Sequence, residues 1–177
     1  MIEIKNQHEI DALRAAGRIA ALTFIEIEST IQPGAVLKDI DQVAEKFIKK
    51  HGAETLYKGI RQLPHQRPFP GVICASVNQQ ICHGIPDSRV LKEGDIVGID
   101  IGLKYKGWCG DMCRTFEVGQ VTPETHRLVE TARQSLKKGI EVALIGNRIG
   151  KIGATSQTFA ESQGYSVVRE YGGHGIG

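Results

Sequence analysis

The sequence has little of several features that would assign it to a special class of protein. Only 4 of its 177 residues are cysteine, and none forms the CxxC pair of a zinc ribbon. No apolar run is long enough to span a bilayer, and the N-terminus lacks the apolar core of a signal peptide. The lysines and arginines are scattered and the net charge is only +2, so no basic stripe suggests nucleic acid. These absences favour a cytoplasmic protein without nucleic-acid specificity or membrane attachment.

The remaining composition is that of a globular α/β protein. Apolar residues make up 41%, charged residues 24%, and there are 21 glycines, in a chain long enough for one domain with a real core. The cysteines are Cys74, Cys82, Cys109 and Cys113. Because they lie on strand-like segments, we expect small buried core residues, with a thiolate site around Asp111 as the alternative.

Two helices are predicted near the N-terminus, separated by a glycine break. Asn6 and Glu9 form a capping box that opens a helix expected to run toward Thr30. A second amphipathic helix is expected at about 38–50, ending at Gly52.

The same pattern recurs 112 residues later, with a long helix at about 123–142 and a shorter one at about 148–163. The matched pairs are Ala20 and Ala132, Gly34 and Gly146, Ile40 and Ile152, Phe47 and Phe159, and Gly52 and Gly164. We therefore predict a single domain, 1–177, built of two related halves at about 1–118 and 119–177. The second half is expected to be incomplete, because the counterpart of its last hairpin would fall beyond residue 177.

Asp100 and Asp111 lie on strand-like segments on either side of a Lys-Tyr-Lys-Gly tip, which predicts a β-hairpin. A turn centred between Tyr105 and Lys106 makes the two aspartates direct cross-strand neighbours, with Cβ atoms about 4.5–5.5 Å apart. Two like charges in that position repel, and a divalent cation between them removes the repulsion. The alternatives are a solvent-facing pair on an edge hairpin and a different register.

Other segments predict further strands and a loop. Residues 72–77 read as a buried strand, 83–84 as a short extended run before Pro86, and the stretch near 167–168 as another strand. Residues 61–68, rich in Pro, Gln and Arg, are expected to form an exposed loop.

Four ordered blocks of the sequence resemble type I methionine aminopeptidase. They are Asn78-x-x-x-Cys82-His83-Gly84-Ile85-Pro86, Gly94-Asp95-Ile96-Val97-x-Ile99-Asp100-Ile101-Gly102, Gly110-Asp111-x-Cys113-Arg114-Thr115-Phe116 and Gly172-Gly173-His174-Gly175-Ile176-Gly177. The resemblance covers essentially the whole chain. It implies the pita-bread fold, an α/β (α+β) architecture of two pseudo-symmetric halves around a dinuclear metal centre. The implied activity is removal of the N-terminal methionine from nascent proteins by metal-activated water.

The resemblance also implies a role for several residues. Asp100 would bind one of two divalent metal ions (Co, Mn, Fe or Zn), Asp111 would bridge both, and His174 would bind the second. His83 would act beside the metals as a catalytic residue that contacts the substrate.

The substrate implied by the resemblance is the N-terminal methionine of a nascent peptide. Cys74 and Phe69 match positions that line the family's methionine pocket, where a thiol and an aromatic ring suit a thioether. A monomer with transient ribosome contact is the expected state.

The family pattern continues beyond His174 with a second histidine and two glutamate ligands. With three of the five protein ligands before Gly177, a chain of this length is expected to be weakly active or inactive, as a fragment of a longer enzyme. Four alternatives stay open. They are a proline-directed aminopeptidase of the same fold, a non-catalytic pita-bread protein that binds peptides or ribosomes, a small protein completed by a second polypeptide, and an inactive fragment.

Overall fold

The computed structural model describes residues 3–61 and 63–176. The chain divides into two compact units, the first comprising the described residues up to Val121 together with Ile176, and the second spanning Thr122–Gly175. No helix of the described residues is long and apolar enough to cross a membrane. The organisation into a single domain stays a prediction.

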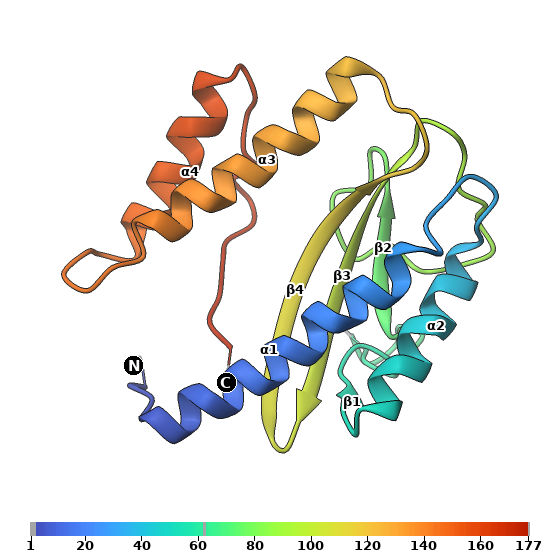
Figure 1. The fold of residues 1–177 in the computed structure, drawn as a ribbon, viewed down its shortest axis with the longest axis horizontal. Coiled ribbons are helices and arrows are strands. Elements are labelled where there is room, and N and C mark those ends of the chain that lie inside the picture. Colours follow the sequence, from blue (N-terminus) through green and yellow to red (C-terminus); the bar gives the residue numbers. More distant parts are fainter. Residues whose placement is uncertain (1–2, 62, 177) are drawn as a thin grey trace. The chain divides into compact units, whose positions relative to one another are not determined.

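Two helices of the first unit confirm the predicted helix pair. Helix α1 (Gln7–Glu28) begins with the capping box, in which the Glu9 N–H donates to the Asn6 side chain at 3.0 Å and the Asn6 N–H donates to the Glu9 carboxylate at 2.7 Å. Helix α2 is Leu37–Lys50. Both helices pack on the same face of the sheet (Figure 1).

The sheet of the first unit is antiparallel. It consists of β1 (Glu54–Thr55), β2 (Ile73–Val77), β3 (Ile96–Tyr105) and β4 (Trp108–Glu117). The central strand β3 pairs with the other three. Its alternate residues Val97, Ile99, Ile101 and Leu103 are fully buried in the core with the apolar faces of α1 and α2. Because strand side chains alternate, the residues between them lie on the opposite face.

The β3–β4 hairpin forms as predicted, but its register differs from the expectation. Tyr105 pairs with Trp108, so the turn consists of Lys106 and Gly107. Both have positive φ, 49° and 89°, as a type I′ turn requires. The predicted centre, between Tyr105 and Lys106, was wrong because the glycine belongs at the second turn position rather than after the turn.

Two other expectations in the first unit were also wrong. His83 does not lie in an extended run, since its φ is 56°, in the left-handed region. The cysteines are not uniformly core residues: Cys74 is buried, Cys82 and Cys109 are half-buried and Cys113 is exposed. The strand at 72–77 is confirmed as Ile73–Val77.

The second unit contains helix α3 (Pro123–Glu141) and helix α4 (Gly150–Ser162). Reciprocal hydrogen bonds join them: the Ser135 hydroxyl donates to the Ser156 carbonyl at 2.9 Å, and the Ser156 hydroxyl donates to the Ser135 carbonyl at 3.2 Å. The strand predicted near 167–168 was wrong, because residues 165–168 have no regular structure. The described residues of this unit contain no strand with which this stretch could pair.

Candidate metal and substrate site

The candidate site lies on the sheet face opposite α1 and α2, here called the carboxylate face. Strand alternation and the observed register place side chains of three strands on it. They are Cys74 and Ser76 of β2, Asp100 of β3, and Asp111, Cys113 and Thr115 of β4. The two aspartates therefore share a face, as the sequence predicted.

The aspartates are diagonal rather than direct neighbours. Asp100 pairs with Cys113, and Asp111 pairs with Gly102. Diagonal cross-strand residues lie about 7–8 Å apart, which reduces their repulsion compared with a direct pair. The separation leaves room for a cation between the two side chains, bound by one carboxylate oxygen from each aspartate. Metal–oxygen distances in such sites are about 2.0–2.6 Å.

Tyr57 follows β1 and reaches Asp100 on the carboxylate face. Its hydroxyl donates to Asp100 Oδ1 at 2.7 Å. Burial, followed by this hydrogen bond to a negative group, raises the pKa of Tyr57 above its usual value, so the phenol keeps its proton.

Cys74 is the direct neighbour of Asp100 on β2. Burial and then the negative charge of Asp100 raise the pKa of the Cys74 thiol to about 12, so it stays neutral. A neutral buried thiol behaves as a small apolar group suited to a thioether.

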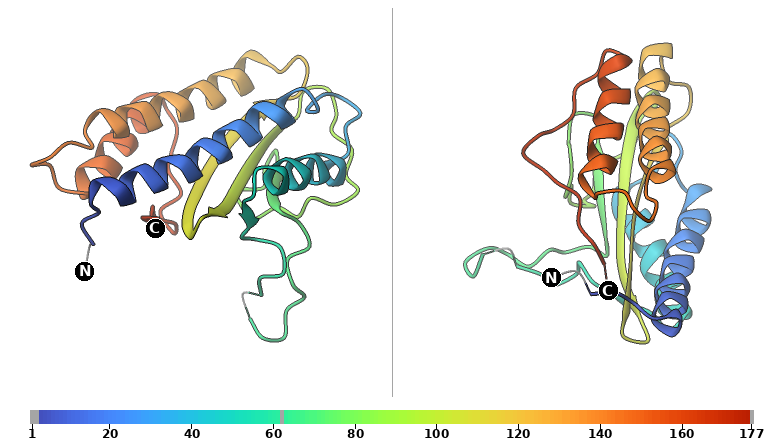
Figure 2. Two further views of the ribbon diagram at one scale, coloured as in Figure 1. Left: turned by 60° about the horizontal axis from the view of Figure 1, so that its bottom comes forward. Right: turned by 90° about the vertical axis from the view of Figure 1, so that its left-hand side faces the viewer.

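Phe69 closes the base of the predicted exposed loop, which extends away from the sheet (Figure 2). Its N–H donates to the Ile60 carbonyl at 2.7 Å, and its carbonyl accepts from the Gly59 N–H at 2.9 Å. The ring is half-buried, five residues before Cys74. The described residues of this loop are exposed, as predicted.

His83 lies beside β2 because Gly84 packs directly against that strand. The Gly84 carbonyl accepts from the Ala75 N–H at 2.8 Å, and the Gly84 N–H donates to the Ser76 hydroxyl at 3.1 Å. A Cβ on Gly84 would lie 2.1 Å from the Ala75 carbonyl oxygen, so only glycine fits. The left-handed backbone at His83 is thus held by its neighbour, and the imidazole is exposed.

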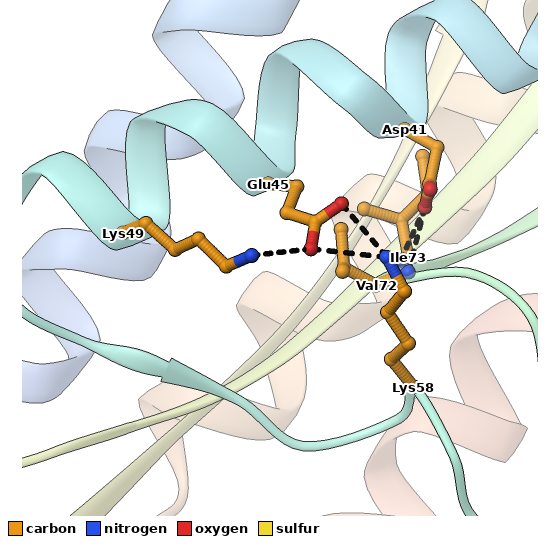
Figure 3. Close-up of polar contacts among 6 residues, drawn as sticks. All are labelled: Asp41, Glu45, Lys49, Lys58, Val72 and Ile73. Carbon is orange, nitrogen blue, oxygen red and sulfur yellow. Dashed lines mark hydrogen bonds and ion pairs between the residues drawn. The ribbon is translucent and has the colours of Figure 1, made fainter.

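Asp41 of α2 fixes the start of β2 from the side of the sheet that α2 covers (Figure 3). Its Oδ1 accepts from the Val72 N–H at 2.7 Å and from the Ile73 N–H at 3.0 Å, and the residue is 6% exposed. Burial raises the pKa of the Asp41 carboxyl, while these two N–H groups act in the opposite direction. Asp41 thereby positions the strand that carries Cys74.

His174 belongs to the second unit, where it is exposed and its Nδ1 lies 3.0 Å from the Gly175 carbonyl oxygen. Within residues 3–61 and 63–176, no three His, Cys, Asp or Glu side chains converge as a complete metal-binding set. The first unit supplies a carboxylate pair, a donor set that fits a hard or borderline divalent cation better than a structural zinc.

Sequence reasoning missed Tyr57 and Asp41. Asp41 carried a usable signal, since it occupies the apolar stripe of α2 that also contains Leu37, Ile40, Ala44 and Ile48. Tyr57 carried none, because its partner lies 43 residues away along the chain.

Comparison with known proteins relates this chain to an established family. The sequence profile of metallopeptidase family M24 matches residues 11–177. Methionine aminopeptidase 1 of Bacillus subtilis is 46% identical over 177 residues, covering 100% of this chain and 69% of its own length.

Solved structures agree with this comparison and confirm the α/β pita-bread fold. The crystal structure of methionine aminopeptidase from Rickettsia prowazekii has a TM-score of 0.92 and 39% identity, with 99% of this chain and 68% of that chain covered. The enzyme from Thermotoga maritima has a TM-score of 0.92 and 34% identity, with 99% and 69% covered. The chain thus spans a little over two thirds of the length of these relatives.

Proposed function

Because the chain belongs to metallopeptidase family M24 and, within it, to the methionine aminopeptidases, we propose that it hydrolyses the bond after an N-terminal methionine. The observation that carries the proposal is the placement of Asp100 and Asp111 on one sheet face, beside the buried thiol of Cys74. This combines a place for a cation with an apolar contact for the methionine side chain.

Membership of the family implies the use of divalent metal, and the proposed ligands in this chain are Asp100, Asp111 and His174. When bound, two divalent ions (Co, Mn, Fe or Zn) would acidify a water and polarise the scissile carbonyl. The two carboxylates would hold the ions, and the imidazole would add one nitrogen donor.

The proposed substrate contacts lie around the carboxylate face. Cys74 and Phe69 would contact the methionine side chain, and His83 would donate a hydrogen bond to the peptide or to the oxyanion formed during attack. The proposed substrates are nascent chains in the cytoplasm. The protein is proposed to act on them as a monomer in transient contact with the ribosome. The four free thiols are in keeping with a reducing compartment.

Release of methionine from Met-Ala-Ser by this chain tests the proposal. We expect a slow release that requires added Mn²⁺, Co²⁺ or Fe²⁺ and falls below detection in Asp100→Asn and in Asp111→Asn. Asp11→Asn makes the same chemical change at an exposed position of α1 and should leave the rate unchanged.

Two results would contradict the proposal. One is the absence of methionine release with all three metals, which would favour the inactive fragment named above as an alternative. The other is a release that survives in both Asp100→Asn and Asp111→Asn, which would mean that another site or a contaminating peptidase is responsible.

A further inference from the structure

Tyr57 is placed where it can control the orientation of the Asp100 carboxylate. The segment that carries it leaves β1 along the edge of β3, where the Leu56 N–H donates to the Gly102 carbonyl at 3.0 Å. The next residue, Tyr57, turns its side chain onto the carboxylate face and donates its hydroxyl to Asp100 Oδ1 at 2.7 Å. This short O–H···O⁻ bond is of the stronger, charge-assisted kind.

Gly102 makes this position of the tyrosine ring attainable. A Cβ on Gly102 would lie 2.6 Å from Tyr57 Cε1, 2.8 Å from Cζ and 2.9 Å from the hydroxyl oxygen. Any larger residue at 102 would therefore push the ring away. Gly102 is also the cross-strand partner of Asp111, so the ring lies over a residue that is next to both aspartates on the carboxylate face.

We infer that Tyr57 is a positioning residue for the metal ligand Asp100, holding Oδ1 so that the carboxylate presents a fixed geometry to a divalent cation. This inference rests on the proposed function, since it assumes that Asp100 binds metal. Groups that hydrogen-bond a metal-binding carboxylate fix its orientation, and their loss typically weakens metal affinity about 10–100-fold.

The substitution Tyr57→Phe removes only the hydroxyl and keeps the ring over Gly102, so folding should be preserved. Tyr105→Phe is the matched control, because Tyr105 lies on β3 on the face that packs against the core. Co²⁺ is the probe: calorimetry gives its Kd, and the visible absorption of bound Co²⁺ reports its coordination geometry. Asp100→Asn tests whether the measured binding occurs at the proposed site.

We expect the Kd for Co²⁺ to rise about tenfold in Tyr57→Phe, with an altered visible spectrum and an unchanged Tm, while Tyr105→Phe behaves as the wild type. Equal Kd and spectrum in the two tyrosine variants, with binding lost in Asp100→Asn, would overturn the role of Tyr57 and leave the proposed function standing. Absence of Co²⁺ binding to the wild type, or undiminished binding in Asp100→Asn, would overturn the metal site itself and the inference with it.

Discussion

At the scale of single residues, Asp41 shows how a buried carboxyl group can position a functional strand. Both amide donors at the start of β2 reach the same oxygen, Asp41 Oδ1. Asp41→Ala should therefore leave two buried N–H groups without an acceptor and lower the free energy of unfolding by about 2–4 kcal/mol. Asp41→Asn keeps a carbonyl oxygen in that place and should change it by less than about 1 kcal/mol.

Urea unfolding of the two variants measures this difference. Asp39→Ala is the control, since Asp39 is an exposed aspartate in the first turn of the same helix. Its loss should cost at most about 1 kcal/mol, through the helix dipole. Equal destabilisation by Asp41→Ala and Asp41→Asn would show that the charge, rather than the acceptor oxygen, stabilises this part of the fold.

The same carboxyl gives a pH dependence of defined sign. Burial raises the pKa of Asp41 in the folded state, and Glu45 adds to this effect while Lys58 opposes it (Figure 3). A raised pKa means that the folded state favours the protonated form, so its stabilising contribution is present at low pH and lost as pH rises through the folded pKa. Wild-type stability relative to Asp41→Asn should therefore fall as pH rises above 3.8, the ordinary pKa of an aspartate.

At the scale of secondary structure, two glycines that meet no neighbour should respond oppositely to alanine. A Cβ on Gly17, inside α1, or on Gly107, in the hairpin turn, would find no heavy atom within 4 Å. Gly17→Ala should raise the free energy of unfolding by about 0.5–1 kcal/mol, because alanine loses less backbone entropy in a helix. Gly107→Ala should lower it by about 1–2 kcal/mol, because φ there is 89°.

Thermal unfolding of the two variants compares the same added methyl group in two backbone conformations. If both substitutions changed Tm in the same direction, the conformational explanation would be wrong. The result would also test the type I′ turn, and with it the diagonal placement of Asp100 and Asp111.

The sequence predicted elements well where local chemistry determines them. The capping box and the apolar periodicity located α1 and α2 to within two residues. Strand alternation correctly predicted that Asp100 and Asp111 share one face of the sheet. The predicted register was wrong by two positions, but a shift of two residues keeps every side chain on the same face. Contacts made over long separations, such as Tyr57 with Asp100, depend on how strands are arranged in space and left no local pattern to read.

At the scale of the whole molecule, the 112-residue repeat is visible in the backbone. Gly34 and Gly146 both have φ of 92°, and Gly52 and Gly164 have φ of 70° and 85°. The latter two end α2 and α4 in the same way, each donating its N–H to a carbonyl three residues earlier at 3.0 Å. The two helix pairs therefore have the same glycine conformation between their helices and the same termination of their second helix, as related halves should.

The repeat also reveals a difference in burial between the two helix pairs. In α1, Ala16, Ala20 and Phe24 are buried in the core, at most 3% exposed. Their counterparts in α3 are Leu128, Ala132 and Leu136, and the two leucines are 42% and 61% exposed. Ile140, one turn further on, is 62% exposed. Since residues four apart lie on one side of a helix, these side chains form a continuous apolar stripe.

An apolar stripe of this kind should make the chain bind hydrophobic dyes. The double variant Leu136→Gln/Ile140→Gln should lower the fluorescence of bound anilinonaphthalene sulfonate several-fold. Ile25→Gln makes a comparable change at an isoleucine of α1 that is 64% exposed. It should have little effect because no other exposed large apolar residue of α1 lies within two turns of it. A similar loss of dye binding in the two variants would mean that scattered surface residues, rather than the α3 stripe, account for the apolar surface.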